Sequence, residues 1–190
     1  MADHLQLDSR AVRVLAHPLR ARLLSELRIN GAATATTLAE RLATNTGATS
    51  YHLRKLADVG LVEETAEGTG KQRFWAAAQR SHGWQDADVE NDPDALAAAG
   101  WLREHYWAYL SEKVARWEDA RPRWPVAWRD AAGMSDMLLE LSVPQLEALT
   151  NEINEVIRRH QDAALADPDE NARRVTFLYY ALPTDPEDAP

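Results

Sequence analysis

Cysteine is absent from the 190 residues of this sequence, which excludes disulfide bonds and every metal site built on thiolates. The sequence also lacks any apolar run of about 18 residues, the length a membrane span needs. No charged and then apolar segment of the signal-peptide kind stands at its start. We therefore expect a cytoplasmic protein without a membrane partner, with one extended domain or two small ones.

Basic residues are scarce overall, since 21 Lys and Arg stand against 30 Asp and Glu, a formal net charge of −9. The balance differs along the chain. Residues 1–80 carry 11 basic and 8 acidic side chains, whereas residues 81–190 carry 10 and 22. A modest basic surplus confined to one half fits local contacts to DNA phosphates, and it does not fit a nonspecific DNA coat.

The stretch 34–78 has the order of signals that a helix-turn-helix followed by a β-hairpin requires. Its second helix is predicted to begin after the capping residue Asn45 and to end before Gly60. At helical spacing Thr49, Leu53 and Leu56 share one face, which predicts the core side. The other side carries small, hydroxylated, aromatic and cationic groups that suit the major groove of DNA. The residues predicted to contact DNA from this helix are Thr46, Gly47, Ser50, Tyr51, Arg54 and Lys55, with Ser50, Tyr51 and Arg54 assigned to base edges.

The hairpin that follows is predicted from two strand-like segments, 61–65 and 72–77, around the glycine-rich turn 67–70. Lys71 and Arg73 are separated by one strand residue, so they point to the same face. From that face they would grip the phosphate backbone. The alternative is a plain exposed hairpin whose charges contact only solvent.

Several spaced segments of the first 80 residues resemble the ArsR-type winged-helix repressors of bacteria. The segments that carry the resemblance are Leu15–Leu24, Thr34 with Leu38–Leu42, Ser50–Leu56 and Gly60–Val62. The resemblance implies double-stranded DNA as a partner and a homodimer formed through terminal helices, here Leu5–Ala16 and the helix from Ala95. One departure is Ala43, which stands where the family usually has a turn glycine.

The remainder of the chain is predicted from composition and periodicity. Polar, acidic residues 81–94 are expected to link the winged helix to a long helix that Asp94 caps and that runs from Ala95 to about Asp119. Segments 136–141 and 174–182 are expected to be strands flanking a helix from Pro144 to about Ala164, a β-α-β unit. We expect residues 95–182 to serve dimerisation or ligand sensing and residues 183–190 to form a disordered tail. The fold class is therefore α+β, mainly α.

Five of the seven tryptophans lie between Trp101 and Trp128. They fill either a small core or dimer interface, or a pocket for an aromatic or amphipathic small-molecule effector. The candidate ligand-binding residues are Trp101, His105, Tyr106, Tyr109, Trp124 and Trp128. The six histidines are scattered without metal-ligand spacing, and no catalytic or cofactor-binding motif is present, so we expect no metal, no cofactor and no enzyme activity.

These observations predict a sequence-specific, DNA-binding transcriptional regulator, a homodimeric repressor released by a small molecule. Two alternatives remain open at this stage. One is a winged-helix protein-interaction module that has lost DNA binding, to which the acidic second half would belong. The other is an enzyme with an accessory winged helix.

Overall fold

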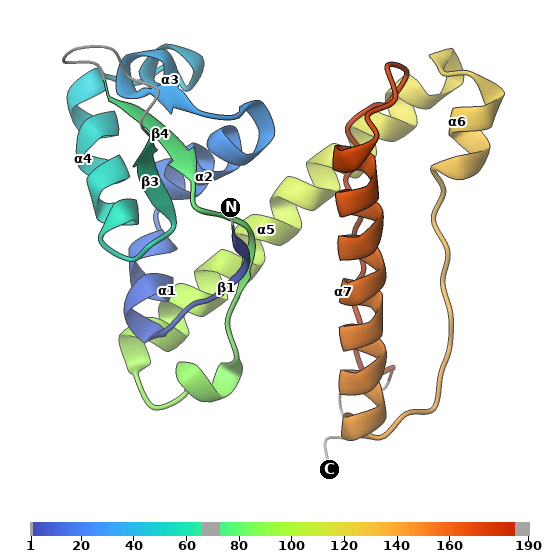
Figure 1. Ribbon diagram of the computed structural model, residues 1–190. Coiled ribbons are helices and arrows are strands. Elements are labelled where there is room, and N and C mark those ends of the chain that lie inside the picture. The colour runs from blue at the N-terminus through green and yellow to red at the C-terminus, as the bar shows by residue number, and fades with distance from the viewer. Residues whose placement is uncertain (1, 66–72, 185–190) are drawn as a thin grey trace. The chain divides into compact units, whose positions relative to one another are not determined.

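The computed structural model describes residues 2–65 and 73–184, and of residues 2 and 3 it describes the backbone alone. The chain divides into two compact units, Met1–Ala131 and Ala132–Pro190. Helices dominate both, and short strands occur in the first (Figure 1). The predicted class, α+β and mainly α, is confirmed.

The first unit contains four short helices before residue 60, and their starts follow from capping side chains. They are α1 (Ser9–Leu15), α2 (Pro18–Asn30), α3 (Ala35–Arg41) and α4 (Thr46–Ala57). The side chains of Asp8, Thr34 and Asn45 accept from the amides of Ala11, Thr37 and Ala48, as N-caps do. The predicted pair of helices between residues 34 and 58 is confirmed.

The wing is an antiparallel sheet in the order β2-β4-β3, formed by β2 (Ala33–Thr34), β3 (Val62–Thr65) and β4 (Phe74–Ala77). Thr65 pairs with Phe74 at the end of the ladder nearest the connection between β3 and β4. The predicted turn 67–70 and Lys71 lie outside the described residues. The core of the unit forms beneath this sheet and the helices, with Leu24, Leu38, Leu53, Leu56, Leu61 and Trp75 among its buried residues.

A second, parallel pair of strands corrects the linker predicted over residues 81–94. β1 (Ala2–Gln6) pairs with β5 (Gln79–Gly83), so that Leu5 lies opposite His82. A 3-10 turn, η1 (Asp86–Asp88), follows β5. The pairing joins segments about 77 residues apart, and both are too polar to show a strand pattern of their own.

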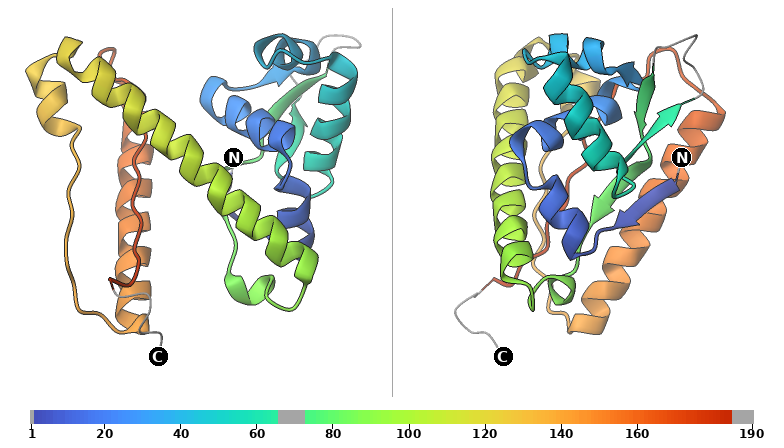
Figure 2. Two further views of the ribbon diagram at one scale, coloured as in Figure 1. Left: turned by 180° about the vertical axis from the view of Figure 1, so that it is seen from behind. Right: turned by 90° about the vertical axis from the view of Figure 1, so that its left-hand side faces the viewer.

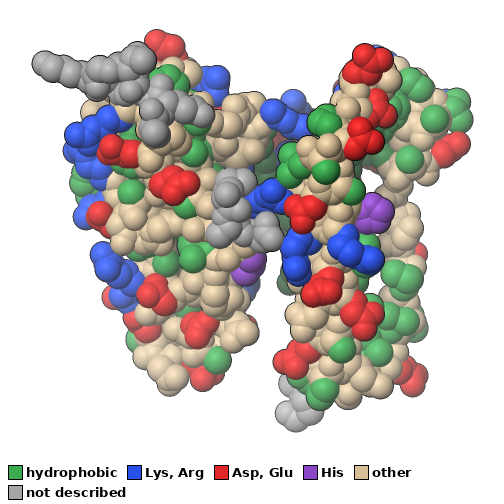
Figure 3. Space-filling model, in the orientation of Figure 1, with side chains coloured by type: hydrophobic (Ala, Val, Ile, Leu, Met, Phe, Trp, Pro, Cys, Tyr) green, Lys and Arg blue, Asp and Glu red, His purple; other side chains and the backbone are tan. Residues whose placement is uncertain are grey.

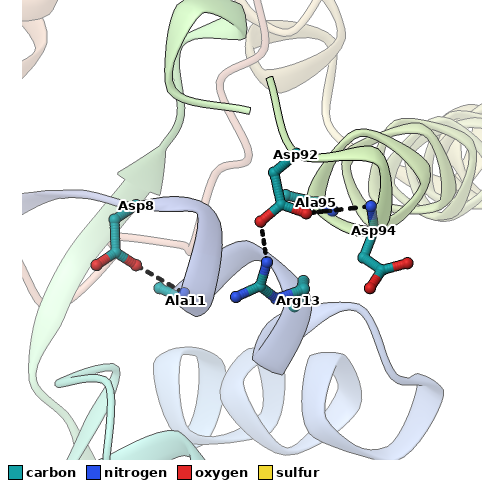
Figure 4. Close-up of polar contacts among 6 residues, drawn as sticks. All are labelled: Asp8, Ala11, Arg13, Asp92, Asp94 and Ala95. Atoms are coloured by element: carbon teal, nitrogen blue, oxygen red, sulfur yellow. Dashed lines mark hydrogen bonds and ion pairs between the residues drawn. The ribbon is translucent and has the colours of Figure 1, made fainter. Parts of the chain in front are cut away.

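The long helix α5 (Pro93–Ala120) belongs to the first unit, and its cap differs from the prediction. Asp92, not Asp94, is the N-cap, because Pro93 takes the first helical position that proline favours. The Asp92 carboxylate accepts from the amides of Asp94 and Ala95 and also pairs with Arg13 of α1 (Figure 4). This contact ties the start of α5 to α1, and these bonds hold the pKa of Asp92 below its ordinary value.

After α5 come η2 (Arg121–Arg123) and α6 (Val126–Ala131), and the second unit contains α7 (Val143–Ala166), capped by Ser142. The β-α-β prediction is wrong in its strands, because neither 136–141 nor 174–182 pairs with another strand in the described structure. The second segment instead runs back along α7 (Figure 2), where the Tyr179 hydroxyl donates to Asn154 Oδ1 at 2.6 Å. Both segments have strand composition, but a ladder requires a partner strand that neither has.

Candidate nucleic-acid interface

The two faces of α4 are separated as its sequence predicts. Thr49, Leu53 and Leu56 are fully buried, and the Thr49 hydroxyl donates to the Asn45 carbonyl at 3.0 Å. On the other side, Ser50 is partly exposed and the remaining candidates are exposed, namely Thr46, Gly47, Tyr51, Arg54 and Lys55. Figure 3 shows Lys and Arg side chains along the left-hand edge, where α4 lies in Figure 1. The structure thus brings the six candidates of this helix onto one accessible surface.

Two of these side chains differ in how they are held. Lys55 Nζ lies 5.8 Å from the centre of the Tyr51 ring and 4.0 Å from an Asp58 carboxylate oxygen, so its charge is partly engaged. No hydrogen bond or ion pair holds the Arg54 guanidinium within the described part of the chain. Arg54 therefore presents its full set of donors outward, which suits bidentate contact with a guanine edge or a phosphate.

A histidine pair supports the flank of α4. The rings of His17 and His52 lie 4.4 Å apart, and Arg20 Nη1 lies 3.4 Å from His52 Nδ1. His17 also caps α2, because its Nδ1 accepts from the Leu19 amide at 3.1 Å. Burial lowers the pKa of both histidines, and Arg20 lowers them further. Both rings are therefore neutral at physiological pH, and they fix α4 against the start of α2.

The turn before α4 is tight in spite of Ala43. Ala43 has φ of 50°, the left-handed region that glycine adopts without strain, and the Thr44 amide donates to the Ala39 carbonyl at 2.9 Å. At the other end, Gly60 has φ of 73°, and the Leu61 amide donates to the Leu56 carbonyl at 3.0 Å. The Gly60 position confirms the predicted helix end.

Of the two wing candidates, only Arg73 lies within the described residues. Its guanidinium donates to a Glu64 carboxylate oxygen at 2.9 Å across the hairpin, and both side chains are exposed. An exposed ion pair of this kind contributes little to stability, so it yields readily to a phosphate. The contact of Arg73 with DNA remains a prediction.

The aromatic residues predicted to bind a ligand form two clusters and not one pocket. Near the middle of α5, Trp101 stacks on His105 with ring centres 4.8 Å apart. Beyond the end of α5, Trp124 lies edge-on between Trp117 and Trp128, at 5.5 and 5.6 Å. Tyr109 lies apart from both clusters, with Lys113 Nζ 5.0 Å from its ring centre. Tyr106 lies edge-on to His105, with ring centres 5.9 Å apart, and also forms a hydrogen bond with His82, which is described below.

Neither a metal cluster nor a membrane-spanning helix is found among the described residues. No group of three or more His, Asp or Glu side chains there is arranged to hold a metal ion. No helix in the same part of the chain is both long enough and apolar enough to cross a membrane.

Sequence reasoning missed one group of polar residues that the structure brings together. Arg28 of α2, His82 of β5 and Tyr106 of α5 form a hydrogen-bonded chain inside the first unit. No sequence motif predicts this group, because its members lie on three elements far apart in the sequence. The only local signal was a histidine in a segment whose composition predicted a linker.

The chain is similar to a known helix-turn-helix family and to solved structures of transcriptional regulators. Residues 15–65 match the family described as helix-turn-helix domain. A solved structure titled as a possible transcriptional regulator for arsenical resistance is 30% identical, with a match covering 58% of this chain and 96% of that chain and a TM-score of 0.33. The homodimeric winged helix-turn-helix DNA-binding domain of a possible ArsR-family regulator from Mycobacterium bovis is 26% identical. That match covers 36% of this chain and 61% of the other, with a TM-score of 0.33. No curated protein sequence gave a significant match.

Proposed function

The chain belongs to the ArsR-type winged helix-turn-helix transcriptional regulators, and we propose that it is a homodimeric repressor that reads a specific DNA sequence and is released by a small organic molecule. DNA binding and transcriptional regulation follow from the family. Repression, the dimer and the effector are the specific parts of the proposal. A regulator of this kind acts where the DNA lies, in the cytoplasm.

The observation that carries the proposal is the division of α4 into a buried and an exposed face. The buried face anchors the helix to the core through Leu53 and Leu56. The exposed face presents Ser50, Tyr51 and Arg54 together, so hydroxyl groups and an unengaged guanidinium can reach base edges. A helix presented in this way, followed by a β-hairpin, is suited to lie in the major groove while the wing contacts the backbone.

A dimer is proposed because one recognition helix reads too few base pairs for a specific site, whereas two helices related by a twofold axis read two half-sites. The related domain from Mycobacterium bovis is homodimeric. In this chain Val12 and Leu15 of α1 are fully buried within the unit, so α1 has little apolar surface to offer. Trp107 and Val114 of α5 are 61% and 53% exposed. We therefore propose α5 as the main dimerisation helix.

The experiment that tests this function is selection of genomic DNA fragments with the purified full-length protein at a stated salt concentration. The enriched sequence is then titrated by fluorescence anisotropy. We expect a palindromic site bound at least a thousandfold more tightly than random DNA, the lower end of the range for specific binding. Failure to enrich any sequence, with cell extract present as well as absent, would contradict DNA reading and favour a protein-interaction module.

Arg54 gives the sharpest variant for the same titration. Arg54→Ala is expected to weaken operator binding by about 1–3 kcal/mol and to relax preference at one base position. The matched control is Arg159→Ala, which removes the same charge from an exposed position on α7, in the second unit. An unchanged base preference in Arg54→Ala, or an equal loss in the control, would refute the assignment of Arg54 to a base.

A further inference from the structure

A pocket of about 300 Å³, open at the surface of the first unit and called the cavity below, lies apart from the candidate DNA-reading face of α4. Its lining combines cations with aromatic rings and comes from α2, β5, α5 and the residue that follows β5. The lining residues are Arg28, Arg80, Ser81, His82, Trp84 and Tyr106. This volume falls at the lower end of the range of small-molecule sites.

Arg28 is a largely buried cation without a counterion within the described part of the chain. Its Nε donates to the Gln79 carbonyl at 3.2 Å, and its Nη1 donates to His82 Nδ1 at 2.6 Å. Its Nη2 is buried and has no hydrogen-bond partner among the described residues. The Gln79 side-chain oxygen is likewise buried without a partner, so these two atoms do not satisfy each other. A buried charge ordinarily has an anion beside it.

The hydrogen bonds that link Arg28, His82 and Tyr106 determine which atom of each pair donates the proton. A guanidinium only donates, so His82 Nδ1 must accept and the ring proton must lie on Nε2. Nε2 then donates to the Tyr106 hydroxyl oxygen at 2.8 Å. The Tyr106 hydroxyl hydrogen is therefore left to donate elsewhere, and no acceptor for it is found in the described structure.

Both ends of this hydrogen-bonded series thus offer a donor that has no acceptor among the described residues, Arg28 Nη2 at one end and the Tyr106 hydroxyl at the other. Both residues line the same cavity, with Arg80 as a second cation and the Trp84 indole as an apolar wall. Burial, then the charges of Arg28 and His4, together lower the pKa of His82 to about 3, so the ring stays neutral and keeps this arrangement at physiological pH. An occupant that accepts at two oxygens and carries negative charge would satisfy what the protein leaves open.

We propose that this cavity binds a small organic carboxylate, with its oxygens accepting from Arg28 and Tyr106 and its apolar part against Trp84. The site joins α2, which supports α4, to β5, which follows the wing strand β4, and to α5. An occupant would therefore contact the elements that set the position of the recognition helix relative to a partner subunit. That regulatory consequence rests on the proposed function, whereas binding of the carboxylate does not.

The test uses the full-length protein and isothermal titration calorimetry with benzoate as the probe. Benzamide, which has the same shape without the charge, is the neutral control, and inorganic phosphate tests whether any anion suffices. We expect benzoate to bind and benzamide to bind at least tenfold more weakly. Absence of benzoate binding, or equal binding of benzamide, would overturn the proposal. Phosphate binding as tightly as benzoate would show a simple anion site and overturn its organic part.

Two variants locate the binding. Tyr106→Phe keeps the ring and removes the hydroxyl donor, and we expect it to weaken benzoate about tenfold. Tyr109→Phe, three residues further along α5, is the matched control: Tyr109 does not line the cavity, so benzoate binding should be unchanged. Arg28→Gln should abolish benzoate binding. If the Arg28→Gln protein fails to fold, Tyr106→Phe still tests where benzoate binds. Equal affinities in the two Tyr variants would overturn the assignment.

Two further measurements test the tautomer of His82 and the effect of benzoate on DNA binding separately. The ¹⁵N chemical shifts of the His82 ring report its tautomer, and a proton on Nδ1 would overturn the donor arrangement at Tyr106. Anisotropy of the operator with and without benzoate then measures the effect on DNA. Binding of benzoate by a protein that selects no DNA sequence would support the site while the proposed function failed, so the two failures are distinguishable.

Discussion

The folded protein should lose stability at acidic pH because His82 is protonated more readily in the unfolded chain. Replacing His82 by Gln should remove most of this loss. Burial, then Arg28 and then His4, lower the pKa of His82 from 6.5 to about 3 in the folded protein. Tyr106 is the other titratable group facing the ring, and burial raises its pKa to about 12, so it stays neutral across the range. Gln can accept from Arg28 and donate to Tyr106 as the neutral imidazole does, but it does not titrate.

The size of the effect follows from the two pKa values. Below pH 6.5 the unfolded chain binds a proton at His82 that the folded chain does not bind until about pH 3. This contribution to stability is complete above pH 6.5 and is lost as the pH falls through that window. One proton corresponds to about 1.4 kcal/mol per pH unit, so lowering the pH from about 7.5 to 4.5 should cost about 2.5 kcal/mol more in the wild type than in His82→Gln.

Urea denaturation at a series of pH values measures this difference directly. Carboxylates and the other histidines titrate in both proteins, so their contributions cancel in the comparison. We expect the free energy of unfolding of the two proteins to converge as the pH falls, if the variant starts less stable. Parallel pH profiles would show that His82 is protonated as easily in the folded state as in the unfolded state, and the buried hydrogen-bonded chain would be refuted.

Three further changes test the local arguments around α4 and the wing. Ala43→Gly should stabilise the protein by up to about 1 kcal/mol, because it relieves a positive φ, and a lower midpoint in urea would contradict this. Asn45→Ala should cost about 1 kcal/mol of unfolding free energy, because the Ala48 amide loses its cap, and an unchanged midpoint would refute that role. Arg73→Ala should reduce the salt dependence of operator binding by about one phosphate contact with little change in stability, since its pair with Glu64 is exposed; an unchanged slope would remove Arg73 from the interface.

The DNA-reading half of the molecule was predictable because its signals are local. The cap at Asn45, the helix end before Gly60 and the helical spacing of Thr49, Leu53 and Leu56 all act within one or two turns of chain. Each was read from neighbouring residues, and the structure places each as expected. The same spacing also decides which side chains of α4 are exposed.

The errors arose where the outcome depends on distant partners. β1 and β5 are polar segments that become strands only by pairing with each other. Segments 136–141 and 174–182 have strand composition but no pairing partner in the described structure. Strand preference mostly reflects packing against neighbours, so composition predicts strands poorly when the neighbours are unknown. The cap of α5 is a different kind of error: it was predicted at Asp94, although the preference of proline for the first helical position, applied to Pro93, indicates Asp92.

The two candidate sites of this protein differ in the same way, because one depends on neighbouring residues and the other on residues far apart in the sequence. The proposed DNA contacts of α4 come from 12 consecutive residues with a known period, so a sequence suffices to list the candidates. The cavity depends on Arg28, His82 and Tyr106, whose hydrogen bonds span 54 and 24 positions along the chain. Its chemistry follows from a guanidinium that only donates, which makes His82 accept at one nitrogen and donate at the other. A donor arrangement of this kind exists only after folding, so ligand sites of such regulators are harder to predict from sequence than their DNA-reading helices.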